Sequence, residues 1–166
     1  MYEQLSLLAE LSVGLAGFSS IIVVFRRGAS GHSWIPEDVF RLRIMLSHSL
    51  LGALFAIAPA GLMGLGIPDN LVISSASLLL ALFFGTNLIL GLRRFQALPA
   101  GSLSRPIVGV LSFGSLFFMA VAGLNAFFLL PSAGLGPYVA SVTWLLISAG
   151  VMFYRLVTAP LGSEGA

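Results

Sequence analysis

The chain has 166 residues, of which 58% are hydrophobic and only 8% are charged, and its formal net charge at pH 7 is +2. Because soluble domains carry about 25% charged residues, this composition excludes a water-soluble fold and predicts a single transmembrane domain over residues 1–166. The absence of cysteine excludes disulfides, thiolate chemistry and cysteine-based metal sites.

Five continuous apolar segments are long enough to cross a bilayer as helices. A helix needs about 20 apolar residues to span a hydrocarbon core about 30 Å thick. Continuous apolar runs, unlike alternating ones, favour helices over a β-barrel. The predicted fold is therefore an all-α bundle of five transmembrane helices. The predicted spans are residues 5–25, 44–65, 71–92, 107–130 and 138–157.

The first span carries Glu10 on one helical stripe with Gly14 and Gly17. Small residues let a neighbouring backbone approach closely, so we expect this stripe to face a packed interface rather than lipid. Ionisable residues inside spans are costly and usually face protein or a water-filled cavity. Glu10 is therefore a candidate proton or cation site. The alternative is a carboxyl group that hydrogen-bonds to a neighbouring helix or extends to the outer surface.

The second span places His48 between two serines, where its imidazole is a candidate proton-binding group. The alternative is a hydrogen bond from His48 to Asn87 or to a serine of a neighbouring helix. Gly52 and Ala56 lie one turn apart and predict close helix packing. Pro59 predicts a kink, because proline removes one helical hydrogen bond.

The polar residues of the spans fall into two predicted layers. At 1.5 Å per residue, Glu10 and Asn125 lie at similar depth below the outer boundary, whereas His48 and Asn87 lie near the inner one. This layering predicts that the first span contacts the fourth near the outer face. It also predicts that the second span contacts the third near the inner face.

The arginines predict the orientation of the bundle. Every basic residue is an arginine, and all eight lie in the first loop, in the third loop or at the end of the fifth span. The positive-inside rule makes that side cytoplasmic, so the N-terminus is expected outside and the C-terminus inside. The first four residues lack the positive charge of a signal peptide, so we expect the first span to be retained. Arginine without lysine, together with abundant alanine, glycine and leucine, favours a bacterial inner membrane.

Several chemistries lack the residues they need. Two histidines without cysteine are too few for a zinc site, and no glycine-rich phosphate loop with lysine is present. The segment Gly17–Ser20 is similar to the serine motif of rhomboid-type intramembrane proteases, but five spans are too few for their core. We therefore expect no enzymatic activity, no metal and no cofactor. Nucleic acid is not an expected partner, because the arginines sit at the ends of apolar segments.

The first third of the chain contains Ala9-Glu10-Leu11, Gly14, Ala16-Gly17-Phe18-Ser19 and residues 21–26, followed by Arg41-Leu42-Arg43. In these residues it resembles small uncharacterised bacterial membrane proteins. The resemblance implies no assigned activity.

Two functions are consistent with these features. The first is a small channel, transporter or ion-coupled subunit, a homo-oligomer or a partner of another membrane protein, that uses Glu10 and His48. The alternative is a non-catalytic accessory or interaction protein whose intramembrane polar residues serve only helix packing.

Overall fold

The computed structural model describes residues 2–30, 36–96, 105–130 and 133–158, and their regular secondary structure is entirely α-helical. Each helix contains a segment long and apolar enough to cross a membrane. The predicted fold of five such helices is therefore confirmed for the described residues, and it is consistent with a multi-pass integral membrane protein. The helices are α1 (Tyr2–Ser30), α2 (Pro36–Gly64), α3 (Asp69–Gln96), α4 (Arg105–Ala126) and α5 (Leu135–Thr158).

The fourth predicted span, residues 107–130, extends past the end of α4 at Ala126. Phe128 has a φ of 55°, in the left-handed region that ends many helices. Its N–H donates to the carbonyl oxygen of Asn125 at 3.1 Å, which closes the last turn. The apolar run continues beyond this turn, so hydropathy alone places the boundary too late.

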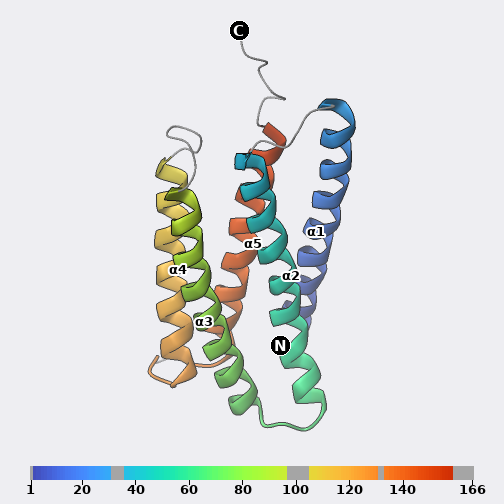
Figure 1. The fold of residues 1–166 in the computed structure, drawn as a ribbon. Coiled ribbons are helices and arrows are strands. Elements are labelled where there is room, and N and C mark those ends of the chain that lie inside the picture. Colours follow the sequence, from blue (N-terminus) through green and yellow to red (C-terminus); the bar gives the residue numbers. More distant parts are fainter. Residues whose placement is uncertain (1, 31–35, 97–104, 131–132, 159–166) are drawn as a thin grey trace.

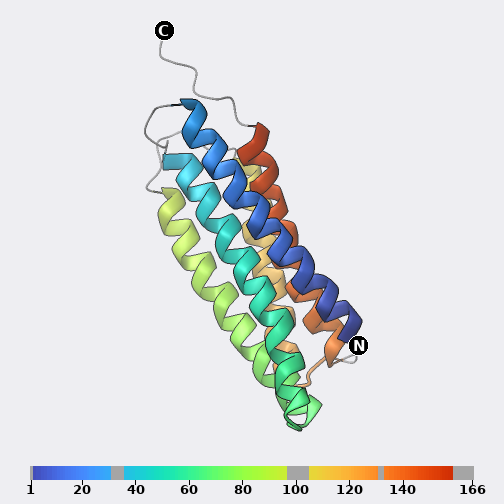
Figure 2. The ribbon, with the colours of Figure 1, turned by 90° about the vertical axis from the view of Figure 1, so that its right-hand side faces the viewer.

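Consecutive helices run in opposite directions and form two hairpins, α1–α2 and α3–α4, which α5 joins (Figure 1). α5 contacts all four other helices. Within the described part of the chain α1 and α4 make no contact, and Figure 2 shows α1 in front with α4 behind. The prediction that the first and fourth spans touch is therefore wrong. Equal depth fixes the height of a residue along the bundle, but it does not determine which helices are neighbours, and both α1 and α4 pack on α5.

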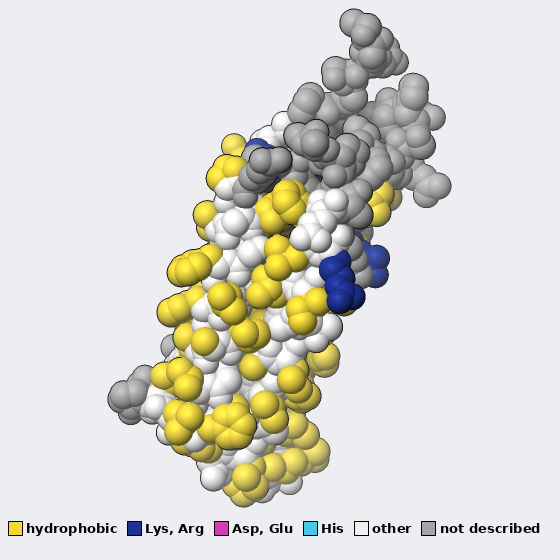
Figure 3. Space-filling model, turned by 60° about the vertical axis from the view of Figure 1, so that its left-hand side comes forward, with side chains coloured by type: hydrophobic (Ala, Val, Ile, Leu, Met, Phe, Trp, Pro, Cys, Tyr) yellow, Lys and Arg dark blue, Asp and Glu magenta, His cyan; other side chains and the backbone are white. Residues whose placement is uncertain are grey.

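All eight arginines belong to helix segments at one end of the bundle, the arginine-rich end. They lie near the ends of α1, α3 and α5 and near the starts of α2 and α4. Between the two ends, the face in Figure 3 shows hydrophobic and uncharged side chains almost throughout, with the dark blue arginines confined to its upper half. This separation of charge from apolar surface matches a helix bundle with lipid around its middle.

The stripe of α1 that carries Glu10 faces away from the rest of the chain. Glu10, Gly14 and Gly17 are not packed against another helix, and no atom lies within 4 Å of a Cβ built on either glycine. The Glu10 carboxylate accepts one hydrogen bond, from the hydroxyl of Ser6 at 3.3 Å. The predicted packing of this stripe is therefore wrong within the single chain. A different stripe of α1, which includes the fully buried Ser12, makes the contact with α2.

The helix pair α1–α2 packs closely at Gly52. A Cβ on Gly52 would lie 2.9 Å from the Ser12 hydroxyl, so any larger residue here would require the Ser12 side chain to move. Ala56, one turn later, is 1% exposed. Pro59 is also buried, and α2 continues through it to Gly64. The kink expected at Pro59 stays a prediction.

Candidate functional site: a polar cavity between four helices

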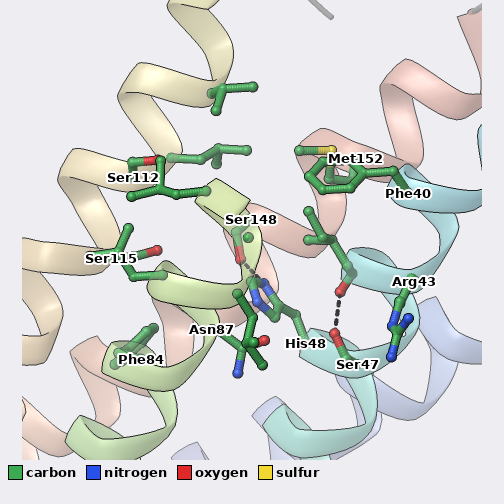
Figure 4. A pocket seen from close by; sticks show the side chains of 17 residues that line it. Phe40, Arg43, Ser47, His48, Phe84, Asn87, Ser112, Ser115, Ser148 and Met152 are labelled. Atoms are coloured by element: carbon green, nitrogen blue, oxygen red, sulfur yellow. Dashed lines mark hydrogen bonds between the residues drawn. The ribbon is translucent and has the colours of Figure 1, made fainter. Parts of the chain in front are cut away.

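A cavity of about 290 Å³ lies between α2, α3, α4 and α5, in the half of the bundle nearest the arginine-rich end (Figure 4). Its walls come from residues 40–48 of α2, 84–92 of α3, 108–115 of α4 and 148–152 of α5. In the opposite half, a continuous hydrophobic core fills the space between the helices. The polar side chains of the cavity wall are Arg43, Ser47, His48, Asn87, Ser112, Ser115 and Ser148.

His48 links three helices at the cavity wall. Its side chain is only 8% exposed, and its Nδ1 lies 2.6 Å from the hydroxyl oxygen of Ser148 on α5. The imidazole also meets the ring of Phe83 on α3 edge to face, with 5.9 Å between ring centroids. α2 and α3 therefore meet at this level through two aromatic rings, and the imidazole is held in one orientation.

Asn87 lines the same cavity as His48, but the two side chains do not hydrogen-bond to each other. The Asn87 amide donates to the carbonyl oxygen of Phe83 in its own helix at 3.1 Å. Its Oδ1 accepts no hydrogen bond from any described residue. The two residues of the predicted inner layer, His48 and Asn87, therefore lie at the same cavity. The Asn87 Oδ1 is a free hydrogen-bond acceptor there.

The α4 wall presents two serines to the cavity. Ser112 makes no hydrogen bond to a described residue, whereas Ser115 accepts one from the Trp144 indole N–H at 3.4 Å. Trp144 stacks on Phe118 with 5.3 Å between ring centroids. Its indole also covers Gly114, where any Cβ would collide with the ring. A tryptophan is therefore packed directly behind the cavity wall.

The charge on the wall is positive. Arg43 is the one charged residue among the described residues that line the cavity, and none of these residues is an aspartate or glutamate. The Arg43 guanidinium makes no ion pair with a described residue. The remaining wall is apolar, with Phe84, Leu111 and Met152 among its larger side chains. Such a wall suits a partly apolar molecule that is neutral or anionic.

Asn125, the second predicted asparagine, lies elsewhere and is fully hydrogen-bonded. Its side chain is 0% exposed, and its amide donates to the Ser77 hydroxyl at 2.8 Å and to the Gly134 carbonyl at 3.0 Å. Its Oδ1 accepts the Gly134 N–H at 2.7 Å. Gly134 has a φ of 136°, which only glycine adopts easily. Asn125 therefore joins α3, α4 and the start of α5.

Of the predicted site residues, His48 and Asn87 lie at the cavity and Glu10 does not. Ser112 and Ser148 were not predicted as site residues, and Arg43 was predicted only to mark the orientation. The one available signal was the spacing of Ser112 and Ser115, which puts two hydroxyls on one face of the fourth span. Nothing in the sequence pairs Ser148 with His48, because that pairing depends on how α5 packs against α2.

Comparisons with models of protein families, with curated proteins and with solved structures find no match to this chain. The resemblance of its first third to small bacterial membrane proteins stays a prediction.

Proposed function

We propose that this protein binds a small amphipathic organic molecule, neutral or anionic, in the cavity and serves as a small transporter or transport subunit. The proposal rests on a cavity with both polar and apolar wall residues, in which Asn87 Oδ1 and Ser112 Oγ have no described partner. Polar groups without partners are costly in a low-dielectric interior, so an occupant with matching polar groups would offset that cost. The volume, about 290 Å³, lies just below the usual range for ligand sites and suits a small molecule.

The charge of the wall supports the choice of ligand class. Arg43 favours an anionic group, and no carboxylate among the described wall residues is present to bind a cation. Ion coupling through Glu10 has less support, because Glu10 lies on the exposed face of α1, away from the cavity. The binding reaction requires neither a cofactor nor covalent chemistry.

We place the arginine-rich end in the cytoplasm and the protein in the inner membrane of a bacterium. The position of all eight arginines, together with the positive-inside rule, supports this orientation. The use of arginine without lysine supports the bacterial membrane. The N-terminus is then outside, the C-terminus is inside, and the cavity lies in the cytoplasmic half of the membrane.

Trp144 offers a direct measurement of binding. The chain has two tryptophans, so Trp34→Phe leaves Trp144 as the only indole, and Trp144 contacts the cavity wall through Ser115. The purified variant in lipid nanodiscs is titrated with octanoate, octanol and octylammonium while its fluorescence is recorded. We expect saturable changes with octanoate and octanol and none with octylammonium. The absence of a saturable change with every probe would refute the proposed function.

Two matched variants separate binding in the cavity from partition into lipid. Ser112→Phe fills the cavity and should abolish the saturable change. Thr86→Phe adds the same ring on the exposed face of α3 and should leave the saturable change intact. Equal effects of the two variants would show that the probes act on the bilayer and not at the cavity.

A second candidate function, a non-catalytic accessory protein, is favoured by Asn125 and by α1. Asn125 is fully used in packing, and the exposed face of α1 with Glu10 is free to contact another membrane protein or a second copy. This function predicts a stoichiometric partner after mild detergent purification that is lost in a Gly14→Leu, Gly17→Leu variant. Purification of a monomer without partner would count against it.

A further inference from the structure

The hydrogen bonds around His48 determine which ring nitrogen carries the proton. The Ser148 hydroxyl lies 2.8 Å from the carbonyl oxygen of Leu145 and 2.6 Å from His48 Nδ1. A carbonyl oxygen can only accept, and a serine has one hydroxyl proton. Both contacts are hydrogen bonds only when Ser148 donates to Leu145 and His48 Nδ1–H donates to Ser148. A neutral His48 is then protonated at Nδ1 and has a free lone pair at Nε2.

The surroundings favour the neutral ring. The side chain is 8% exposed, no carboxylate lies among the described residues of the cavity wall, and Arg43 supplies charge of the same sign as an imidazolium. Burial of a second positive charge without a partner is costly.

The free Nε2 faces the cavity. Among the described residues, two fully buried polar side-chain atoms have no hydrogen-bond partner, Arg41 Nε and Ser49 Oγ. His48 Nε2 has no described partner either, yet it is not one of these fully buried atoms, so it must reach open space. The open space beside His48 is the cavity, which Figure 4 shows between His48, Asn87 and Ser112.

We infer that the ligand carries a hydrogen-bond donor, a hydroxyl or an uncharged N–H, that binds His48 Nε2. This inference rests on the proposed function and specifies its ligand: an amphiphile whose polar end donates to Nε2, with the free Asn87 Oδ1 as a second acceptor on the same wall. A ligand whose polar group only accepts hydrogen bonds leaves the imidazole nitrogen unpaired, so it binds more weakly than a ligand that donates one. Ser148 is a positioning residue, because it acts on the ligand only by fixing the tautomer of His48.

The tautomer can be measured without any ligand. The chain has two histidines, so His32→Gln leaves His48 as the only one. Nitrogen NMR of ¹⁵N-histidine-labelled protein in nanodiscs should show a protonated Nδ1 and an unprotonated Nε2. In Ser148→Ala, which removes the acceptor, the Nε2–H form should gain population. A protonated Nε2 in the otherwise unchanged protein would overturn the inference.

The ligand preference is tested with octanol and its methyl ether, which keeps the oxygen and the chain but replaces the hydroxyl proton with a methyl group. In the Trp34→Phe protein, the alcohol should bind about three- to tenfold more tightly than the ether. The preference should fall to about one in His48→Phe and to an intermediate value in Ser148→Ala. If both probes bind saturably with equal affinity in the unchanged site, the inference fails while the proposed function stands. If neither probe nor octanoate binds saturably, the proposed function fails as well, whatever the tautomer.

Discussion

The Tyr138 hydroxyl on α5 donates a hydrogen bond to the carbonyl oxygen of Phe55 on α2, with 2.5 Å between the two oxygens. In an unbroken helix this carbonyl would accept the N–H of the residue four positions later. That residue is Pro59, which has no N–H to donate. Tyr138 therefore supplies the donor that proline removes, and it joins the two helices that hold His48 and Ser148.

Tyr138→Phe should destabilise the protein by about 1 kcal/mol, because it leaves a buried carbonyl without a donor. The same substitution made in a Pro59→Ala background should cost less than half as much, since an alanine at this position would restore the helical N–H. Unfolding in detergent micelles measures all four variants as a double-mutant cycle. Equal costs in the two backgrounds would show that Tyr138 acts only through packing.

Asn125→Leu should reduce the free energy of unfolding by about 1–3 kcal/mol, because it leaves both polar groups of Gly134 and the Ser77 hydroxyl without their partner. Ser77→Ala removes one of the three hydrogen bonds and should cost about 0.5–1.5 kcal/mol. The order of the two losses, measured by unfolding in detergent micelles, is the critical result. A larger loss for Ser77→Ala would contradict the role given to Asn125.

These residues show how far the sequence determines the fold. Runs of apolar residues are sufficient to predict five helices, and the positions of the arginines are sufficient to predict that they gather at one end. The end of α4 could not be predicted, since Phe128 closes the helix by its backbone conformation within a run that stays apolar.

The cavity could be predicted only in part. Depth along a helix placed His48 and Asn87 in one layer, and both line the cavity. The face of a helix that packs is harder to predict, because lipid is as apolar as a protein core and α1 carries small residues on more than one stripe. The sequence therefore does not distinguish the stripe of Ser12, which packs against α2, from the stripe of Glu10, which is exposed.

The orientation of the protein in the membrane can be measured by labelling a cysteine at either end of α3. The chain has no cysteine, so Asp69→Cys at the start of α3 and Gln96→Cys at its end are each unique thiols, and both positions are exposed. A membrane-impermeant maleimide added to intact cells should label Asp69→Cys and spare Gln96→Cys until the membrane is permeabilised. The reverse pattern would invert the proposed topology.

Glu10→Gln should leave the affinity for octanol unchanged within about twofold and stability within about 0.5 kcal/mol, because its carboxylate is exposed and, among the described residues, hydrogen-bonds only to Ser6. His48→Ala, in contrast, should weaken binding. Proton flux into liposomes that contain each variant is measured in parallel. A flux that depends on Glu10 would restore ion coupling as the function and would argue against the cavity as the working site.

Ser112→Cys tests the cavity most directly, because it places the only thiol of the chain on the α4 wall of the cavity. In inverted membrane vesicles, which expose the cytoplasmic side, a small water-soluble thiol reagent should modify this cysteine, and octanol should slow the reaction. Thr86→Cys, on the exposed face of α3, should show no protection. A Ser112→Cys thiol that octanol does not protect, or that reacts only from the outer side, would contradict a ligand site entered from the arginine-rich end.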